Sequence, residues 1–236
     1  MRFVTVSGED ITDIELRSTP GSSITGRVVL DDGARLTPED IEISPAATDT
    51  DLAVMLGGGA ARARVDKDLR FEMMGINGPR RLRVTRLAPG LAVKAIRHNG
   101  ADITDAVLAF GRKDDSLSEV EVVVTTHVPE IAGAVVDDRN RRVADAAVIA
   151  FAQDRSLWYS GTRFVATVDA ARDGTFSILA LAPAAYYVAA VDTHAVEDLG
   201  HEIENADFLE SLVVGAQRMT LDEGQRAQIA LRLSGR

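Results

Sequence analysis

Apolar and polar residues alternate along much of this chain, so that every second side chain is hydrophobic in several short runs. At residues 80–87, for example, the apolar positions Leu82 and Val84 alternate with arginines. A period of two is typical of a half-buried strand in an antiparallel sheet, because successive side chains point to opposite faces. The same alternation predicts strands at residues 22–30, 39–44, 119–127 and 227–233.

Turn sequences separate these runs. Pairs such as Asn99-Gly100 and Asp173-Gly174 recur between them, and glycine readily adopts the positive φ angles that tight hairpins require. Many short strands with this spacing are typical of a sandwich or a barrel rather than of alternating strands and helices. The expected fold class is therefore all-β.

One segment has helical periodicity instead. Leu209 and Leu212 follow a capping residue, Asn205 or Asp207, at the three- and four-residue spacing of a helix face. We therefore expect one short helix near residues 205–215.

A weak internal repeat organises the chain, because residues 14–33 align with residues 121–140. Self-similarity on this scale predicts two tandem β-sandwich domains. We place the first domain at residues 20–126 and the second at 127–236. Residues 1–19 then form an orphan N-terminal strand or hairpin outside both domains.

Composition narrows the classes of function. The chain has 236 residues, a net charge of −10 and no cysteine, which argues against a nucleic-acid partner and excludes disulfides and thiolate metal sites. No apolar run approaches the roughly 18–20 residues that a membrane-spanning helix needs. The first residues lack the pattern of a signal peptide. Either the protein is not exported by that route, or the chain is a mature portion or fragment of a longer one.

Residues 131–192 resemble the carboxypeptidase regulatory-like domain. The positions that fit the pattern of that family are Gly133, Val135, Val143, Ala146, Val148, Asp173, Gly174, Phe176, Leu181, Pro183 and Tyr186. Ala184 stands where the family has glycine, and in the first repeat Asp68-Leu69 replaces the usual Asp-Gly. The resemblance implies two tandem transthyretin-like, seven-stranded Greek-key sandwiches.

Three aromatic residues form the first candidate binding site. Trp158, Tyr159 and Phe164 lie close together in the sequence, and their rings could stack on a sugar or on a ring of a partner. Aromatic rings serve equally well as core filling beneath a long loop. The related family carries a tryptophan near this place, which favours the structural alternative.

Other candidates for chemistry are weaker. His194 and His201 stand among acidic residues, as in a mixed metal site or in a solvated acidic loop. Asp169 and Asp173 faintly resemble a calcium loop, but the spacing and the closing glutamate of that motif are missing. Motifs of nucleophilic catalysis or phosphate binding are also missing from the sequence. We expect neither an enzyme, nor a metal site, nor a cofactor.

Arg81 and Arg83 belong to the basic cluster at residues 80–86 and share one face of the predicted strand. In an acidic chain they could bind an acidic surface of another copy, although a solvated strand face is the more common arrangement.

Similarity to modules of exported bacterial proteins extends through residues 151–160, 205–212 and 219–233. It implies a non-catalytic structural or interaction module that is extracellular, periplasmic or on the cell surface. Ile11, Ile14 and Leu16 of the N-terminal segment would add a strand to a neighbouring sheet and so allow self-association. The alternative is a carbohydrate- or peptide-binding module that uses Trp158 and Tyr159.

Overall fold

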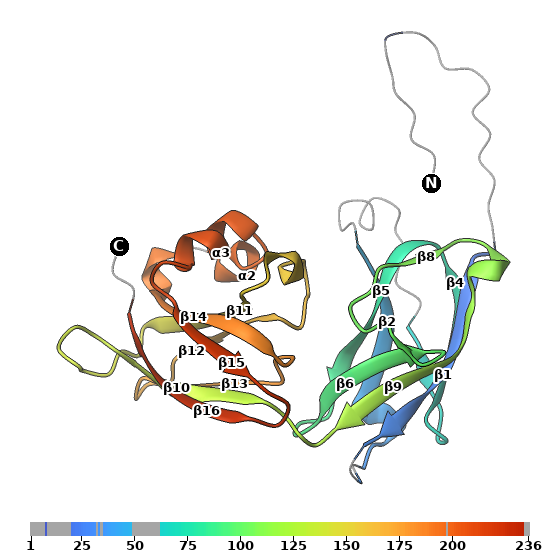
Figure 1. The fold of residues 1–236 in the computed structure, drawn as a ribbon, viewed down its shortest axis with the longest axis horizontal. Coiled ribbons are helices and arrows are strands. Elements are labelled where there is room, and N and C mark those ends of the chain that lie inside the picture. Colours follow the sequence, from blue (N-terminus) through green and yellow to red (C-terminus); the bar gives the residue numbers. More distant parts are fainter. Residues whose placement is uncertain are drawn as a thin grey trace. The chain divides into compact units, whose positions relative to one another are not determined.

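The computed structural model describes Gly8 and residues 20–31, 33, 35–48, 62–196 and 198–233. The described residues form two compact units. Unit 1 contains those up to Pro89 together with Val93–Val124, and unit 2 contains Gly90–Ala92 and those from Thr125 onwards. Strands dominate both units (Figure 1), and the prediction of an all-β sandwich fold is confirmed.

Unit 1 is built from two sheets in its described part. Sheet A has the strand order β3-β4-β1-β9-β6-β7, and sheet B has the order β2-β5-β8. The strands of sheet A are β1 (Ser22–Leu30), β3 (Arg64–Val65), β4 (Arg70–Ile76), β6 (Ala92–His98), β7 (Ala101–Asp102) and β9 (Leu117–Thr125). The strands of sheet B are β2 (Ile41–Ala47), β5 (Gly78–Leu87) and β8 (Leu108–Phe110). Fully buried side chains such as Ile24, Ile43 and Val122 form the core.

Unit 2 repeats this plan with fewer strands in the first sheet, again in the described residues. Sheet C has the order β13-β10-β16, and sheet D has the order β12-β11-β14-β15. The strands are β10 (Glu130–Val136), β11 (Ala146–Ala152), β12 (Val165–Asp169), β13 (Thr175–Leu179), β14 (Ala184–Asp192), β15 (Gln217–Leu221) and β16 (Arg226–Arg232). Tyr186 is fully buried between the sheets, and its hydroxyl donates to the Ala182 carbonyl at 2.6 Å.

The first strand of each unit has the same two neighbours. β1 pairs antiparallel with β4 and parallel with β9, and β10 pairs antiparallel with β13 and parallel with β16. The parallel pairs correct the expectation of purely antiparallel strands, because alternation along a strand reports burial and not direction. Gly26 lies opposite Phe71 and Gly133 lies opposite Phe176, so the repeat in the sequence is also a repeat in three dimensions.

Glycine is required at these two positions by the close approach of the parallel strand. A Cβ atom added at Gly133 would lie 1.8 Å from the Ile229 carbonyl oxygen, and one at Gly26 would lie 2.1 Å from the Val120 oxygen. Both distances are far below van der Waals contact, so any other side chain would force the strands apart.

The turn before the phenylalanine strand differs between the units. Gly174 has φ of +75° in unit 2, whereas Leu69 occupies the matching turn in unit 1 with φ of +57°. Left-handed backbone is unfavourable for leucine. Asp66 supports the turn, since its Oδ1 accepts from the backbone N–H groups of Asp68 and Arg70 at 2.9 Å.

The helix predicted near residues 205–215 is α3 (Ala206–Leu212). Asn205 is its N-cap, and the side-chain oxygen of Asn205 accepts from the Asp207 N–H at 2.9 Å. A shorter helix, α2 (Leu199–Glu202), precedes it despite Gly200. Both helices pack on the outer face of sheet D, against Ile149 and other apolar side chains. Every residue of β11 is therefore buried, because both of its faces are covered.

None of the described helices is long and apolar enough to cross a membrane.

Candidate functional site

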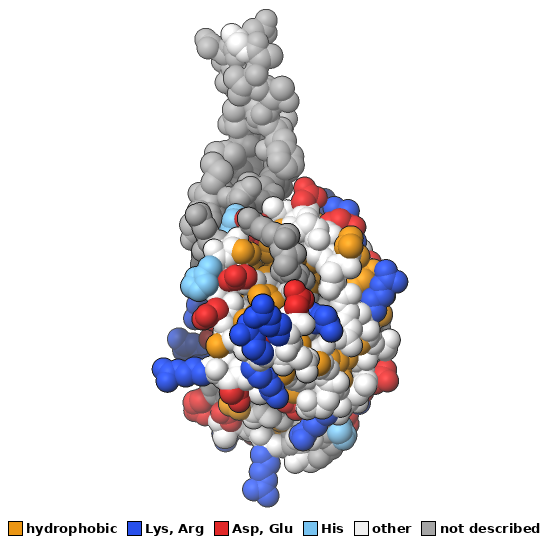
Figure 2. All heavy atoms as spheres, turned by 90° about the vertical axis from the view of Figure 1, so that its left-hand side faces the viewer, with side chains coloured by type: hydrophobic (Ala, Val, Ile, Leu, Met, Phe, Trp, Pro, Cys, Tyr) orange, Lys and Arg blue, Asp and Glu red, His pale blue; other side chains and the backbone are white. Residues whose placement is uncertain are grey.

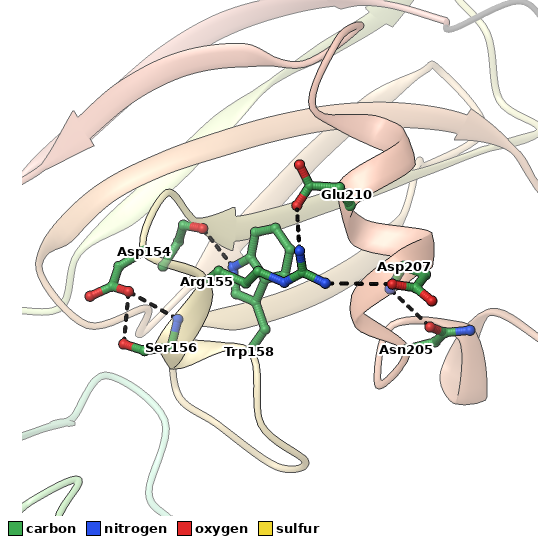
Figure 3. Close-up of polar contacts among 8 residues, drawn as sticks. Asp154, Arg155, Ser156, Trp158, Asn205, Asp207 and Glu210 are labelled. Carbon is green, nitrogen blue, oxygen red and sulfur yellow. Dashed lines mark hydrogen bonds and ion pairs between the residues drawn. The ribbon is translucent and has the colours of Figure 1, made fainter.

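Trp158 follows the 3-10 turn η3 (Arg155–Leu157) and is half-buried on the outer side of sheet D (Figure 3). Its indole N–H donates to the Ala152 carbonyl at 2.6 Å. The ring packs edge-to-face on Phe151, with centroids 5.4 Å apart. The polar group and one side of the indole are therefore already engaged within the unit, by Ala152 and Phe151.

Arg155 connects this turn to α3. Its guanidinium carbon lies 5.9 Å from the centroid of the Trp158 ring. The guanidinium nitrogens lie 3.5 Å from carboxylate oxygens of Asp207 and Glu210 on α3 (Figure 3). Because these groups are exposed, the ion pairs are weak and sensitive to salt. Arg155 thus contacts both the tryptophan ring and α3.

The other two predicted aromatic residues lie in different surroundings. Phe164 is 7% exposed and belongs to the core between sheets C and D, so core filling is the role that its position supports. Tyr159 is half-buried next to Trp158 in the connecting loop.

His194 and His201 are exposed on separate short helical turns. The neighbouring carboxylates cap these turns, since Asp192 accepts from the His194 backbone N–H at 2.8 Å and Asp198 accepts from the His201 backbone N–H at 3.2 Å. No group of three or more His, Asp and Glu side chains among the described residues is arranged to hold a metal ion.

The aspartates with perturbed pKa values stabilise local turns. The pKa of Asp173 lies below its usual value because the Thr175 hydroxyl and N–H donate to its carboxylate. The pKa of Asp154 is lowered in the same way by Ser156. The carboxylate of Asp173 therefore stabilises the turn that ends at Thr175.

Arg81 and Arg83 lie on the outer face of sheet B, opposite Ala46 and Ser44 of β2. Both arginines are half-buried, and Arg81 donates through Nε to the Asp105 carbonyl at 3.2 Å. A role of these residues in binding stays a prediction. Ile11, Ile14 and Leu16 lie outside the described residues.

A different surface of unit 1 is hollowed. A groove of about 1170 Å³ lies on the outer face of sheet A, over β3, β4, β1 and β9 and the end of β6. We call this surface the arginine groove. Its charged lining residues are Arg27, Arg62, Arg64, Arg70, Arg97, Asp66, Glu72, Glu119 and Glu121.

The cations of the arginine groove are only partly neutralised. Arg27 pairs with Glu121 at 2.6 Å. Among the described residues, by contrast, the side chains of Arg64, Arg70 and Arg97 have neither a hydrogen bond nor an ion pair, and all three are exposed. Elsewhere, on the face of the molecule that Figure 2 shows, acidic and basic side chains are interspersed.

Sequence reasoning missed this groove because its residues are scattered between positions 25 and 121. Arg27 and Arg70 are adjacent only through the register of β1 and β4. The only signal in the sequence was the set of polar positions in each alternating strand, and such positions are typical of an ordinary solvated sheet face.

No protein-family model matches the sequence, and no curated protein matches it. Solved structures give distant matches. A Streptococcal ancillary pilin matches with 15% identity and a TM-score of 0.32, over 93% of this chain and 64% of the pilin. The shaft pilin SpaA of Lactobacillus rhamnosus GG (E269A mutant) matches with 11% identity and a TM-score of 0.31, over 93% of this chain and 99% of the pilin.

A DUF3823 family protein from Parabacteroides merdae matches with 15% identity and a TM-score of 0.28, over 73% of this chain and 92% of that protein. The first pilin is longer, and the chain spans about two thirds of it. At these levels of similarity, the matches assign neither a family nor a function. The fold itself defines an all-β protein of two sandwich units with a charged groove on an outer sheet face.

Proposed function

We propose that the chain is a non-catalytic structural and interaction module of an exported or cell-surface protein. The observation that carries this proposal is the form of the arginine groove. It is an open hollow on a sheet face, lined by side chains of both charges. Small substrates are usually held in largely apolar clefts that enclose them, whereas an open charged face suits the surface of a macromolecule.

Self-association is the finer form of this proposal. The alternating segment that contains Ile11, Ile14 and Leu16 would pair with a sheet edge of a neighbouring copy. The support is the sequence alone, because these residues lie outside the described part of the chain.

The test is the mass of the full chain in solution as a function of concentration. We expect sedimentation velocity between about 5 and 200 μM to give a weight-average mass that rises with concentration. The double substitution I11P/I14P should abolish the rise if strand addition causes it, because proline cannot donate to a ladder. A mass that stays at that of the monomer over the whole range would refute self-association.

Export is tested separately. Protease added to intact cells that produce the native protein should degrade it, while a cytoplasmic marker survives. Survival of the chain until the cells are lysed would refute the surface location.

The alternative, a carbohydrate- or peptide-binding module at Trp158 and Tyr159, has less support. The Trp158 N–H is already bonded to Ala152, and the indole ring packs against Phe151. A glycan array combined with quenching of Trp158 fluorescence would test this alternative. Saturable quenching by one glycan would favour a carbohydrate-binding module over a purely structural one.

A further inference from the structure

The arginine groove places two like charges opposite each other in the strand register. Arg27 of β1 lies directly opposite Arg70 of β4 in the antiparallel register. Like charges in this position destabilise a sheet. Glu121 pairs with Arg27 from the other side, at 2.6 Å, whereas the Arg70 side chain has neither a hydrogen bond nor an ion pair among the described residues. Arg64 and Arg97 are two further exposed arginines of the groove, and in the strand register they lie opposite Glu72 and Asp102.

The groove also exposes an apolar side chain. Met74 of β4 is 67% exposed and lines the groove beside Arg70 and Glu72. Methionine and arginine are both enriched in protein-binding surfaces, and methionine adapts its shape to a partner. A partner that fits this surface carries carboxylates around an exposed apolar contact.

Unit 2 carries a surface with those properties. The sequence from residue 173 to residue 217 contains eight acidic residues and not one Lys or Arg. We call residues 198–214, which carry α2 and α3, the acidic cap. The acidic residues of the cap that no Lys or Arg pairs with, among the described residues, are Asp198, Glu202 and Glu204. At the end of α3, Val214 is 97% exposed.

We propose that the arginine groove of one copy binds the acidic cap of a second copy. Arg64, Arg70 and Arg97 then face the cap carboxylates, and Met74 supplies the apolar contact for Val214. Such a contact joins two different surfaces, so each copy keeps one free groove and one free cap, and association continues as a chain of copies. The inference names the partner in the proposed self-association and rests on that function.

The experiment is a pair of charge reversals in the full chain. R64E/R70E reverses the groove, and E202R/E204R reverses the cap; three of these side chains are exposed and Glu202 is half-buried. Each variant alone should associate at least about tenfold more weakly than the wild type in sedimentation velocity at low salt. An equimolar mixture of the two variants should recover association, because every groove again meets a cap of opposite charge.

The matched control is R139E/R172E, which makes the same change of net charge at two exposed arginines of unit 2 outside the cap. It should associate as the wild type does. Raising the salt from 50 to 500 mM should weaken wild-type association by about tenfold, because exposed charges are screened over roughly 4 Å at the higher concentration.

Each remaining outcome overturns the groove–cap contact. If I11P/I14P abolishes association while both charge reversals leave it intact, strand addition is the mechanism and only the present inference fails. If R139E/R172E weakens association as much as R64E/R70E, net charge is the cause. If the wild type is monomeric throughout, self-association itself fails. If the sedimentation coefficient changes with salt but not with protein concentration, the change reflects a contact within one copy and not association.

Discussion

Replacing Gly133 with alanine tests the close approach on which unit 2 is built. The new Cβ would lie 1.8 Å from the Ile229 carbonyl oxygen and 3.2 Å from Cε1 of Phe176. A backbone oxygen cannot rotate away, so β10 and β16 must separate. Overpacking in a core costs about 1–3 kcal/mol, and a contact this short places the cost at the upper end, about 3 kcal/mol.

Urea unfolding followed by Trp158 fluorescence measures this cost, because Trp158 is the single tryptophan of the chain and lies in unit 2. With an m-value of about 2 kcal/mol per M, the midpoint should fall by roughly 1.5 M. The control is Gly200→Ala, where the added Cβ meets only Oδ1 of Asp198, at 3.5 Å. It should be neutral or stabilising by up to about 1 kcal/mol. A Gly133→Ala midpoint equal to that of the control would refute the close approach.

Three further substitutions probe unit 2. Asn205→Ala removes the N-cap side chain that accepts from the Asp207 N–H and should lower the free energy of unfolding in urea by about 1 kcal/mol. No loss would mean that this hydrogen bond does not stabilise the protein. Trp158→Phe removes the hydrogen bond to Ala152 and should lower the free energy of unfolding by about 1–2 kcal/mol, measured by urea unfolding followed by circular dichroism. An unchanged midpoint would mean that the indole N–H does not make this bond. The pKa of Asp173 is lowered in the folded state, so its carboxylate stabilises the fold above the unfolded pKa. The advantage of wild type over Asp173→Asn should therefore be complete at pH 6 and shrink as pH falls below about 4, and a difference that is constant with pH would contradict this.

The sequence predicts local features of the fold, such as helix caps and turns, well. Asn205 ahead of an apolar helical face predicts α3, and the Asp173-Gly174 pair predicts a turn that the φ of +75° confirms. Gly133 and Phe176 fit the family pattern, and the structure gives the reason, because the two residues face each other across β10 and β13. Signals of this kind depend on residues that are neighbours in the chain or on one backbone angle.

The sequence did not predict which distant strands pair with one another, or in which direction. The parallel contact of β1 with β9 joins residues about 94 positions apart, as in Arg27 with Glu121, and alternation is the same for either strand direction. The arginine groove depends on that order of strands, so its composition could not be read before the fold was known. The role of Trp158 could not be predicted from the sequence either. A tryptophan at this position could stack on a ligand or donate to Ala152, and the sequence is the same in both cases.

The two units differ most in what covers the sheets, and the sequence does carry that difference. The connection after β14 is long and contains α2 and α3, whereas β5 reaches β6 within a few residues. Under the helices, β11 is an unbroken apolar run with Ile149 and Phe151 facing the cover. The outer face of sheet B instead presents Arg81 and Arg83. A strand covered on both faces must be apolar throughout, and a strand covered on one face alternates. The helical cover is thus an addition to a shared framework, and it supplies an acidic surface on α2 and α3, whereas the described residues of unit 1 form no α-helix.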